Sequence, residues 1–225
     1  MKVCLFDIDG TLVSTGGAGK AAMEAALVSE FGVVEVIDGI PFSGRTDRAI
    51  GRDLLLRHHV EASPARWQQL VDAYLGHLPA FLAAREGRVL PGIKALLDAL
   101  KQQRYTAGLL TGNIREGARI KLARYGLWDY FAFGSFGDEH FDRDDVAREA
   151  VAALKVYLDA LPGPGRLWVI GDTPLDIRCA RCIGARVAAV ATGWHSMDEL
   201  AYEKPDLLLE DLSNPEPLLS ELRGR

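Results

Sequence analysis

The sequence contains few cysteines, no long apolar run and no excess of positive charge. Its three cysteines, Cys4, Cys179 and Cys182, are too few and odd in number for a disulfide framework, which favours a reducing compartment. No apolar run approaches the ~20 residues of a membrane-spanning helix. Asp7 and Asp9 interrupt the apolar start, so we expect a cytoplasmic protein without a secretory signal. The 26 basic and 31 acidic residues give a net charge of −5, which argues against a nucleic-acid partner.

Short apolar segments alternate with amphipathic helical patterns along most of the 225 residues. The expected strands are Lys2–Phe6, Tyr105–Leu110, Leu167–Ile170, Val187–Ala191 and Leu207–Leu209. The expected helices between them are Ile93–Gln102, Arg115–Tyr125, Asp145–Ala160 and Leu175–Ile183. Continuous apolar strands separated by such helices are typical of a parallel sheet covered on both faces. We therefore predict an α/β fold, a Rossmann-like parallel sheet core with helices on both faces.

Residues 14–87 interrupt this alternation, because they contain almost no strand pattern. They predict four helices: Lys20–Phe31, Arg48–His58, Pro64–Leu75 and Pro79–Arg85. We interpret residues 16–87 as an all-helical cap inserted after the first strand, with residues 1–15 and 88–225 forming the core. The C-terminal segment from Ser213 onward is expected to be loosely held.

Polar side chains follow three of the expected strands. Asp7-Ile-Asp-Gly-Thr11 follows the first, Thr111-Gly-Asn113 follows the second, and Gly171-Asp-Thr-Pro-Leu-Asp176 follows Leu167–Ile170. Because ligands bind beyond the carboxyl ends of parallel strands, we expect these acids to converge at one edge. Converging acids repel one another unless a cation lies among them, and oxygen-only ligands favour Mg²⁺.

These motifs, taken in order, resemble the signature of the haloacid dehalogenase superfamily. The likeness is to its phosphatase branch with a helical cap, broadly to phosphoglycolate-phosphatase-type members, and it spans Met1 to about Thr192. The resemblance implies Mg²⁺-dependent hydrolysis of a small phosphate monoester through an aspartyl-phosphate intermediate. The partner would then be a small phosphorylated metabolite rather than a nucleic acid or a membrane, and the oligomeric state stays open.

Two other functions remain as alternatives. A phosphomutase of the same superfamily would share the core motifs and return the phosphoryl group to a sugar. A receiver-like phosphoacceptor domain would also carry an acidic pocket, but the long helical insertion argues against it, because a lid serves to exclude water during chemistry.

The resemblance assigns roles to the acids. Asp7 would be the nucleophile, and Asp9 would protonate the leaving oxygen and then deprotonate the attacking water. Magnesium would be held by the Asp7 carboxylate, the Asp9 backbone carbonyl and Asp172. Asp176 would orient a metal-bound water or the loop, or it would be an ordinary acid in the first turn of a helix.

Thr111 would donate its hydroxyl to a phosphoryl oxygen, together with the backbone N–H groups of Gly112 and Asn113. A role of Thr111 as the N-cap of the following helix is compatible with this. The third family motif usually supplies a lysine, and in this sequence the basic candidate is Arg143. Its alternative is a solvated residue at a helix start.

The segment Gly44-Arg-Thr-Asp-Arg48 opens a helix in the expected cap. Cap loops of this kind contact the non-phosphate end of the substrate in related enzymes, so Arg45 is the specificity candidate. The alternative is a helix-entry loop in which Thr46 or Asp47 caps the helix.

Overall fold

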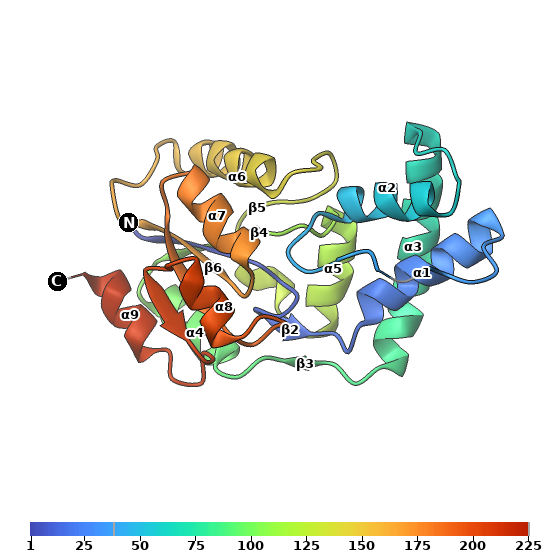
Figure 1. Cartoon of the computed structure of the whole chain (residues 1–225). Helices are drawn as coiled ribbons and strands as arrows, with labels where there is room; N and C mark the ends of the chain where they lie inside the picture. The colour runs from blue at the N-terminus through green and yellow to red at the C-terminus, as the bar shows by residue number, and fades with distance from the viewer. Residues whose placement is uncertain (38, 225) are drawn as a thin grey trace.

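The computed structural model describes residues 1–37 and 39–224, and within them a central sheet of six parallel strands is formed (Figure 1). The strands are β1 (Val3–Phe6), β4 (Thr106–Leu110), β5 (Gly134–Ser135), β6 (Leu167–Gly171), β7 (Arg186–Val190) and β8 (Leu207–Leu209). Their order is β5-β4-β1-β6-β7-β8. The chain moves outward from β1 in one direction and from β6 in the other, so the strand order reverses between these two neighbours. That reversal is where ligands bind in open α/β sheets.

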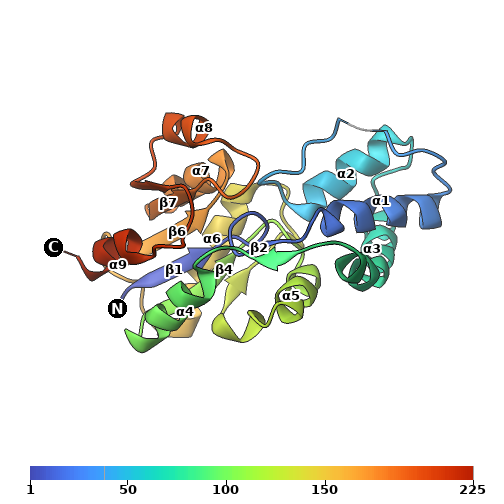
Figure 2. The ribbon, with the colours of Figure 1, turned by 90° about the horizontal axis from the view of Figure 1, so that it is seen from below.

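Helices cover both faces of the sheet (Figures 1 and 2). One face carries α4 (Ile93–Gln102), α5 (Arg115–Arg124) and α9 (Glu216–Arg223), and the other carries α6 (Arg143–Leu158), α7 (Pro174–Cys182) and α8 (Met197–Tyr202). Cys4 and Phe6 of β1 pack into the first layer, whereas Val3 and Leu5 pack into the second. This alternation explains why β1 is apolar throughout, and the predicted α/β fold is confirmed. A short 3₁₀ helix, η1 (Trp128–Tyr130), follows α5.

Three further helices gather at one end of the molecule and are called the helical unit below (Figure 1). They are α1 (Ala18–Phe31), α2 (Asp47–Arg57) and α3 (Pro64–Ala84), and they bury an apolar cluster of their own. That cluster also includes Ile114 and has Ile120 of α5 packed against it. The chain enters and leaves the unit through a short antiparallel ribbon, in which β2 (Val13–Ser14) pairs with β3 (Arg88–Val89).

Helix α3 corrects the prediction of two helices separated near Pro79. It runs without a break from Pro64 to Ala84 with Pro79 inside it. The buried side chains Leu70, Tyr74, Leu78 and Leu82 recur every four residues along one face. Because this stripe packs continuously in the helical unit, tertiary burial outweighs the local cost of one lost hydrogen bond.

The C-terminal segment is also better held than expected. Leu218, Leu219 and Leu222 of α9 are buried in the same layer as α4. No bounds were predicted for strand β5, because two residues are too short to form a pattern. Among the residues that the structure describes, no helix is long and apolar enough to cross a membrane.

Candidate active site

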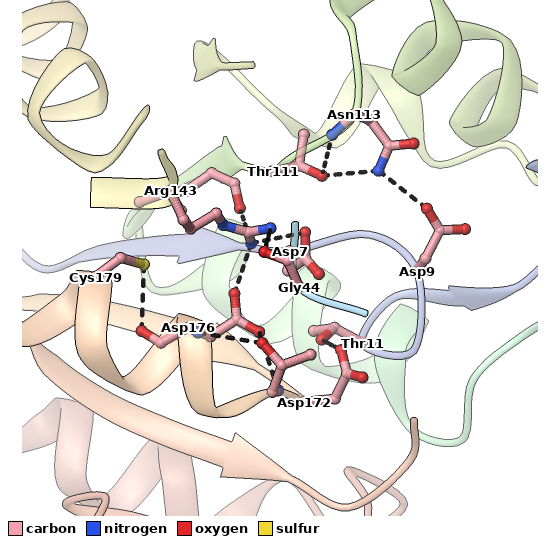
Figure 3. A network of polar contacts seen from close by, with 12 residues as sticks. Asp7, Asp9, Thr11, Gly44, Thr111, Asn113, Arg143, Asp172, Asp176 and Cys179 are labelled. Carbon is pink, nitrogen blue, oxygen red and sulfur yellow. Dashed lines mark hydrogen bonds and ion pairs between the residues drawn. The ribbon is translucent and has the colours of Figure 1, made fainter. Parts of the chain in front are cut away.

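The candidate active site lies at the carboxyl ends of β1, β4 and β6 (Figure 3). Asp7 directly follows β1, and its backbone N–H donates to the Ile170 carbonyl of β6 at 3.0 Å. Thr111 follows β4, and Asp172 follows β6. The parallel sheet thus gathers at one edge three side chains that lie far apart in the sequence.

Arg143 is a buried cation at this edge, and its guanidinium lies close to four oxygen atoms. Nη2 is 2.6 Å from Asp176 Oδ1, 3.1 Å from the Leu110 carbonyl and 3.0 Å from Asp7 Oδ1. Nη1 donates to the Gly44 carbonyl at 3.3 Å. Arg143 is the first residue of α6, but it is only 4% exposed, so it is not a solvated helix-start residue.

Asp7 keeps one carboxylate oxygen, Oδ1, without a hydrogen bond. Nη2 of Arg143 carries two N–H groups, and it donates to the Leu110 carbonyl and to Asp176. Its contact with Asp7 is therefore an ion pair that lacks an aligned N–H. Burial raises the pKa of Asp7 to about 6, although Arg143 acts to lower it. A buried oxygen in this condition is suited to bind a cation or an electrophilic phosphorus.

Asp9 belongs to a second polar cluster, on the side of the site that faces α5. Its Oδ2 accepts hydrogen bonds from Lys121 Nζ at 2.5 Å and from Asn113 Nδ2 at 2.9 Å. Its Oδ1 accepts from the Thr15 hydroxyl at 3.4 Å, which is long for a hydrogen bond. Figure 3 shows the Asp9 carboxylate directed toward Asn113 and apart from Asp7. The Asp9 side chain is 39% exposed and that of Asp7 is 6% exposed, so Asp9 is the more accessible acid.

Asn113 connects this second cluster to Thr111. Its Oδ1 accepts from Lys121 at 2.5 Å, so Nδ2 faces Asp9 and the Thr111 hydroxyl oxygen, each at 2.9 Å. The Asn113 backbone N–H also donates to that hydroxyl oxygen, at 3.3 Å. Because the Thr111 oxygen accepts from both groups, its own proton is free to donate. Burial dominates the pKa of Asp7, and this hydroxyl is among the groups that lower it.

Lys121 is a site residue that the sequence analysis missed. It lies in α5 on the buried face with Gly117, Ala118 and Leu122, and it is 4% exposed. The available signal was a lysine at an apolar position of an amphipathic helix, four residues after Gly117. Burial alone would lower the pKa of Lys121, but Asp9 beside it helps to raise the pKa above its ordinary value.

The loop before α2 lies directly against two loops of the core. The Asp47 N–H donates to the Gly112 carbonyl at 2.7 Å, and a Cβ at Gly112 would stand 2.0 Å from the Arg45 carbonyl. At Gly44, φ is +69°, and a Cβ would stand 2.6 Å from Thr173 Oγ1. These approaches require glycine and bring the helical unit over the edge that carries the carboxylates.

The hydrogen bonds of Arg45, the specificity candidate, stay within the helical unit and its loop. Nη1 donates to the Pro41 carbonyl at 3.0 Å, and Nη2 donates to Asp53 at 2.5 Å. Thr46 is the N-cap of α2, and its hydroxyl accepts from the Ala49 N–H at 3.1 Å. The loop therefore shows the helix-capping arrangement that was expected as the alternative.

The N-terminus of α5 is held by carboxylates and not by Thr111. Its N-cap is Ile114, whose N–H donates to Asp47 Oδ2 at 2.9 Å. The Arg115 N–H donates to Asp138 Oδ2 at 2.8 Å. The expectation that Thr111 caps this helix is wrong, because the helix begins farther along the chain.

A comparison with protein families identifies the chain. Residues 4–190 match the family model described as haloacid dehalogenase-like hydrolase. The chain belongs to this family. It is therefore an enzyme of the hydrolase class, and the resemblance inferred from the motifs is confirmed.

Relatives of this haloacid dehalogenase-like hydrolase extend over nearly the whole chain. A phosphoglycolate phosphatase of Synechococcus elongatus is 28% identical, covering 95% of each chain. A phosphoglycolate phosphatase of Agrobacterium fabrum is 26% identical, covering 97% of this chain and 92% of the relative. The crystal structure of CbbY from Rhodobacter sphaeroides in complex with phosphate matches with a TM-score of 0.74 at 20% identity, covering 95% and 96% of the two chains. The structural match shows a shared fold, and the relatives support a phosphatase function.

The carboxylates of this hydrolase could hold a cation. Oxygen atoms of Asp7, Asp172 and Asp176 lie within 4.8 Å of one another, and all three residues are buried. Burial, followed by the charges of Asp176 and Asp7, raises the pKa of Asp172 well above its ordinary value. The single positive charge of Arg143 offsets only part of the negative charge of these three carboxylates. Buried acids that offer only oxygen atoms fit a hard divalent cation.

Asp176 already uses both of its carboxylate oxygens. Oδ1 accepts from Arg143, and Oδ2 accepts from the Thr173 N–H at 3.0 Å and the Thr173 hydroxyl at 2.7 Å. The bond from the Thr173 N–H, together with the bond from the Asp176 N–H to the Thr173 hydroxyl oxygen, forms the capping box of α7, so Asp176 does lie in a first helical turn. Asp172 Oδ1 accepts from the Thr11 hydroxyl at 2.8 Å. Asp7 and Asp172 are thus better placed than Asp176 to give oxygen atoms to a cation.

Proposed function

We propose that the protein hydrolyses a small phosphate monoester with Mg²⁺ and forms an aspartyl phosphate on Asp7. The observation that carries the proposal is the buried Asp7 Oδ1, which lacks a hydrogen bond and lies 3.0 Å from Arg143 Nη2. A nucleophilic carboxylate next to a guanidinium suits phosphoryl transfer, because the cation stabilises the charge that develops on the phosphoryl oxygens.

The residues around Asp7 would bind and orient the phosphoryl group. The Asp7 carboxylate, the Asp9 backbone carbonyl and Asp172 would hold Mg²⁺, which supplies charge that lessens repulsion between the nucleophile and the phosphate. Thr111 would donate its hydroxyl proton to a phosphoryl oxygen, together with the Gly112 and Asn113 N–H groups. Asp176 would keep Arg143 and the loop after β6 in place.

The reaction has two displacements at phosphorus. Asp7 attacks, the bond to the leaving oxygen breaks, and Asp9 gives that oxygen its proton. Water then attacks the phosphorus while Asp9 takes a proton from it, and the bond to Asp7 breaks to release inorganic phosphate. Asp9 ends each cycle protonated, as it began.

The helical unit would act as a cap domain of residues 16–87 on a core of residues 1–15 and 88–225. Its separate apolar cluster and the close approach of Gly44 to the site support this division. A cap in this position would exclude water from the aspartyl phosphate. Arg45 would contact the substrate only if it exchanged its bond to Asp53 for one to the ligand.

The test is phosphate release from a panel of monoesters by the purified protein in Mg²⁺. Phosphoglycolate heads the panel, because both relatives described above carry the name phosphoglycolate phosphatase. Labelled substrate should leave its phosphoryl group on Asp7, and Asp7→Asn should abolish turnover while the protein still folds. Label on a different residue would sink the mechanism, and sugar-phosphate interconversion without phosphate release would indicate a mutase.

A further inference from the structure

A lysine without a part in the phosphoryl chemistry above is buried beside Asp9. Nζ of Lys121 makes 2.5 Å hydrogen bonds to Asp9 Oδ2 and to Asn113 Oδ1. Burying an ammonium group is costly unless it is closely paired and hydrogen-bonded. The fold keeps this charge at the site, although an apolar side chain would suit the buried face of α5.

The two oxygens of Asp9 are treated differently. Oδ2 accepts from both Lys121 and Asn113, at 2.5 Å and 2.9 Å. Oδ1 has the 3.4 Å contact from Thr15. We propose that Lys121 is a positioning residue that anchors Oδ2, directly and through Asn113, and so leaves Oδ1 to exchange the proton with the leaving group. This inference rests on the proposed function.

The direction of Asp9 agrees with that task. In an in-line displacement the leaving oxygen lies on the opposite side of phosphorus from the attacking atom. Figure 3 shows the Asp9 carboxylate apart from Asp7, and Asp9 is also the more exposed of the two acids. An acid held away from the nucleophile can reach a leaving oxygen that departs toward the open side.

The surroundings of Nζ favour positioning over direct binding of substrate. A Cβ on Gly19 of α1 would stand 3.0 Å from Nζ and 3.9 Å from the Tyr74 hydroxyl oxygen. The helical unit therefore covers the ammonium group of Lys121. On the side that faces the site, the ammonium group donates its two short hydrogen bonds to Asp9 and Asn113. Lys121 acts through Asp9 and Asn113.

The experiment compares phenyl phosphate with p-nitrophenyl phosphate, whose better leaving group needs less protonation. Four variants are required: Lys121→Met, Asp9→Asn, the double variant, and Lys155→Met as a control on exposed surface of α6. Asp9→Asn leaves the buried Lys121 ammonium without its carboxylate, whereas the double variant removes both partners, so comparing the two shows whether an unpaired charge impairs folding. Thermal unfolding of each variant is measured alongside activity.

Lys121→Met should lower kcat for phenyl phosphate at least ~10-fold more than for p-nitrophenyl phosphate, and Lys155→Met should be silent. In the Asp9→Asn background, the added Lys121→Met change should have little effect on either substrate. An equal loss on both substrates, or a further large loss in that background, would overturn the inference. If Asp9→Asn itself shows no leaving-group dependence, the proton-transfer role of Asp9 fails, and the inference fails with it.

Discussion

Arg143 and Lys121 are both buried cations beside an active-site aspartate, but they hold their partners in different ways. The guanidinium of Arg143 lies against two carboxylates and two backbone carbonyls, one of them from the loop of the helical unit. The ammonium of Lys121 donates hydrogen bonds to Asp9 and Asn113. A guanidinium presents its donors in a rigid planar fork, whereas an ammonium is a compact point charge on a flexible stem. Asp7, the proposed nucleophile, is accordingly buried beside the guanidinium, whereas Asp9 is 39% exposed and its Oδ1 has a long, 3.4 Å contact from Thr15.

Removal of the proposed Mg²⁺ should have the largest effect, because it would act directly on Asp7, the proposed nucleophile. EDTA should abolish phosphate release, and added Mg²⁺ should restore it. Asp172→Ala should raise the Mg²⁺ concentration needed for half-activity, because its carboxylate is buried next to Asp7 and binds no basic side chain in the described residues. Full activity after rigorous chelation would contradict the metal site.

Asp9→Asn should remove the proton transfer that we assign to Asp9. The expected loss is roughly 10²–10⁴-fold on alkyl phosphates, the range for general acid–base catalysis. The loss should shrink for p-nitrophenyl phosphate, whose leaving group departs without a proton. A loss of the same size for every substrate would assign Asp9 to metal geometry alone.

Arg143→Ala would show how much the Arg143 guanidinium contributes to kcat/KM in addition to the proposed Mg²⁺. We expect kcat/KM to fall at least ~10²-fold, as it does when other pre-organised charge stabilisers are removed. Arg143→Lys should recover part of the loss, because a point charge replaces the fork. Lys155→Ala is the matched control on the exposed side of α6 and should be nearly silent. A severe loss in Lys155→Ala with a mild one in Arg143→Ala would show that the third motif has been misplaced.

Asp47 offers the smallest and most selective test, at the boundary between the helical unit and α5. Burial, opposed by Lys121, raises the pKa of Asp47 from 3.8 to about 6. Because the folded pKa lies above the unfolded one, its stabilising contribution is present below about pH 4 and is lost as the pH rises through about 6. Asp47→Asn keeps an acceptor for the Ile114 N–H but does not ionise.

The free energy of unfolding of Asp47→Asn, relative to wild type, should therefore increase by about 2 kcal/mol between about pH 4 and pH 7. Denaturant unfolding at the two pH values measures this difference. A difference that does not change with pH would show that the Asp47 carboxylate is not buried against α5 as described.

The sheet and its covering helices were predictable, because their information is local. The apolar run of β1 and the amphipathic pattern of α4 identify these elements without any partner, and α4 has the predicted bounds. Helix α3 was predicted wrongly, because burial of its stripe against the helical unit decides whether Pro79 can stay inside. Strand β5 has two residues, so its pairing to β4 defines it and its composition does not.

The residues of the candidate site also differ in whether local sequence or tertiary packing determines their positions. Asp7, Thr111 and Asp172 could be placed at one edge because each follows an apolar strand of a parallel sheet. The contacts of Lys121 and Asp47 could not be predicted, because each depends on tertiary packing. The Asp47 contact depends on how the helical unit packs against α5, and the Lys121 contact depends on how α5 lies against the loop after β1. No local pattern says which acid a buried lysine will meet.

The β2–β3 ribbon has a consequence for the modularity of the protein. Val13 pairs with Val89 and Ser14 pairs with Arg88, so the chain leaves and re-enters the sheet layer at adjacent points. In connectivity, everything between them is one long loop, and a short hairpin turn could bridge the gap. In packing it is not dispensable, because its removal would expose Ile114 and Ile120 of the core to water. A lineage could therefore exchange this insertion without disturbing the sheet, provided that each replacement supplied an apolar surface for α5.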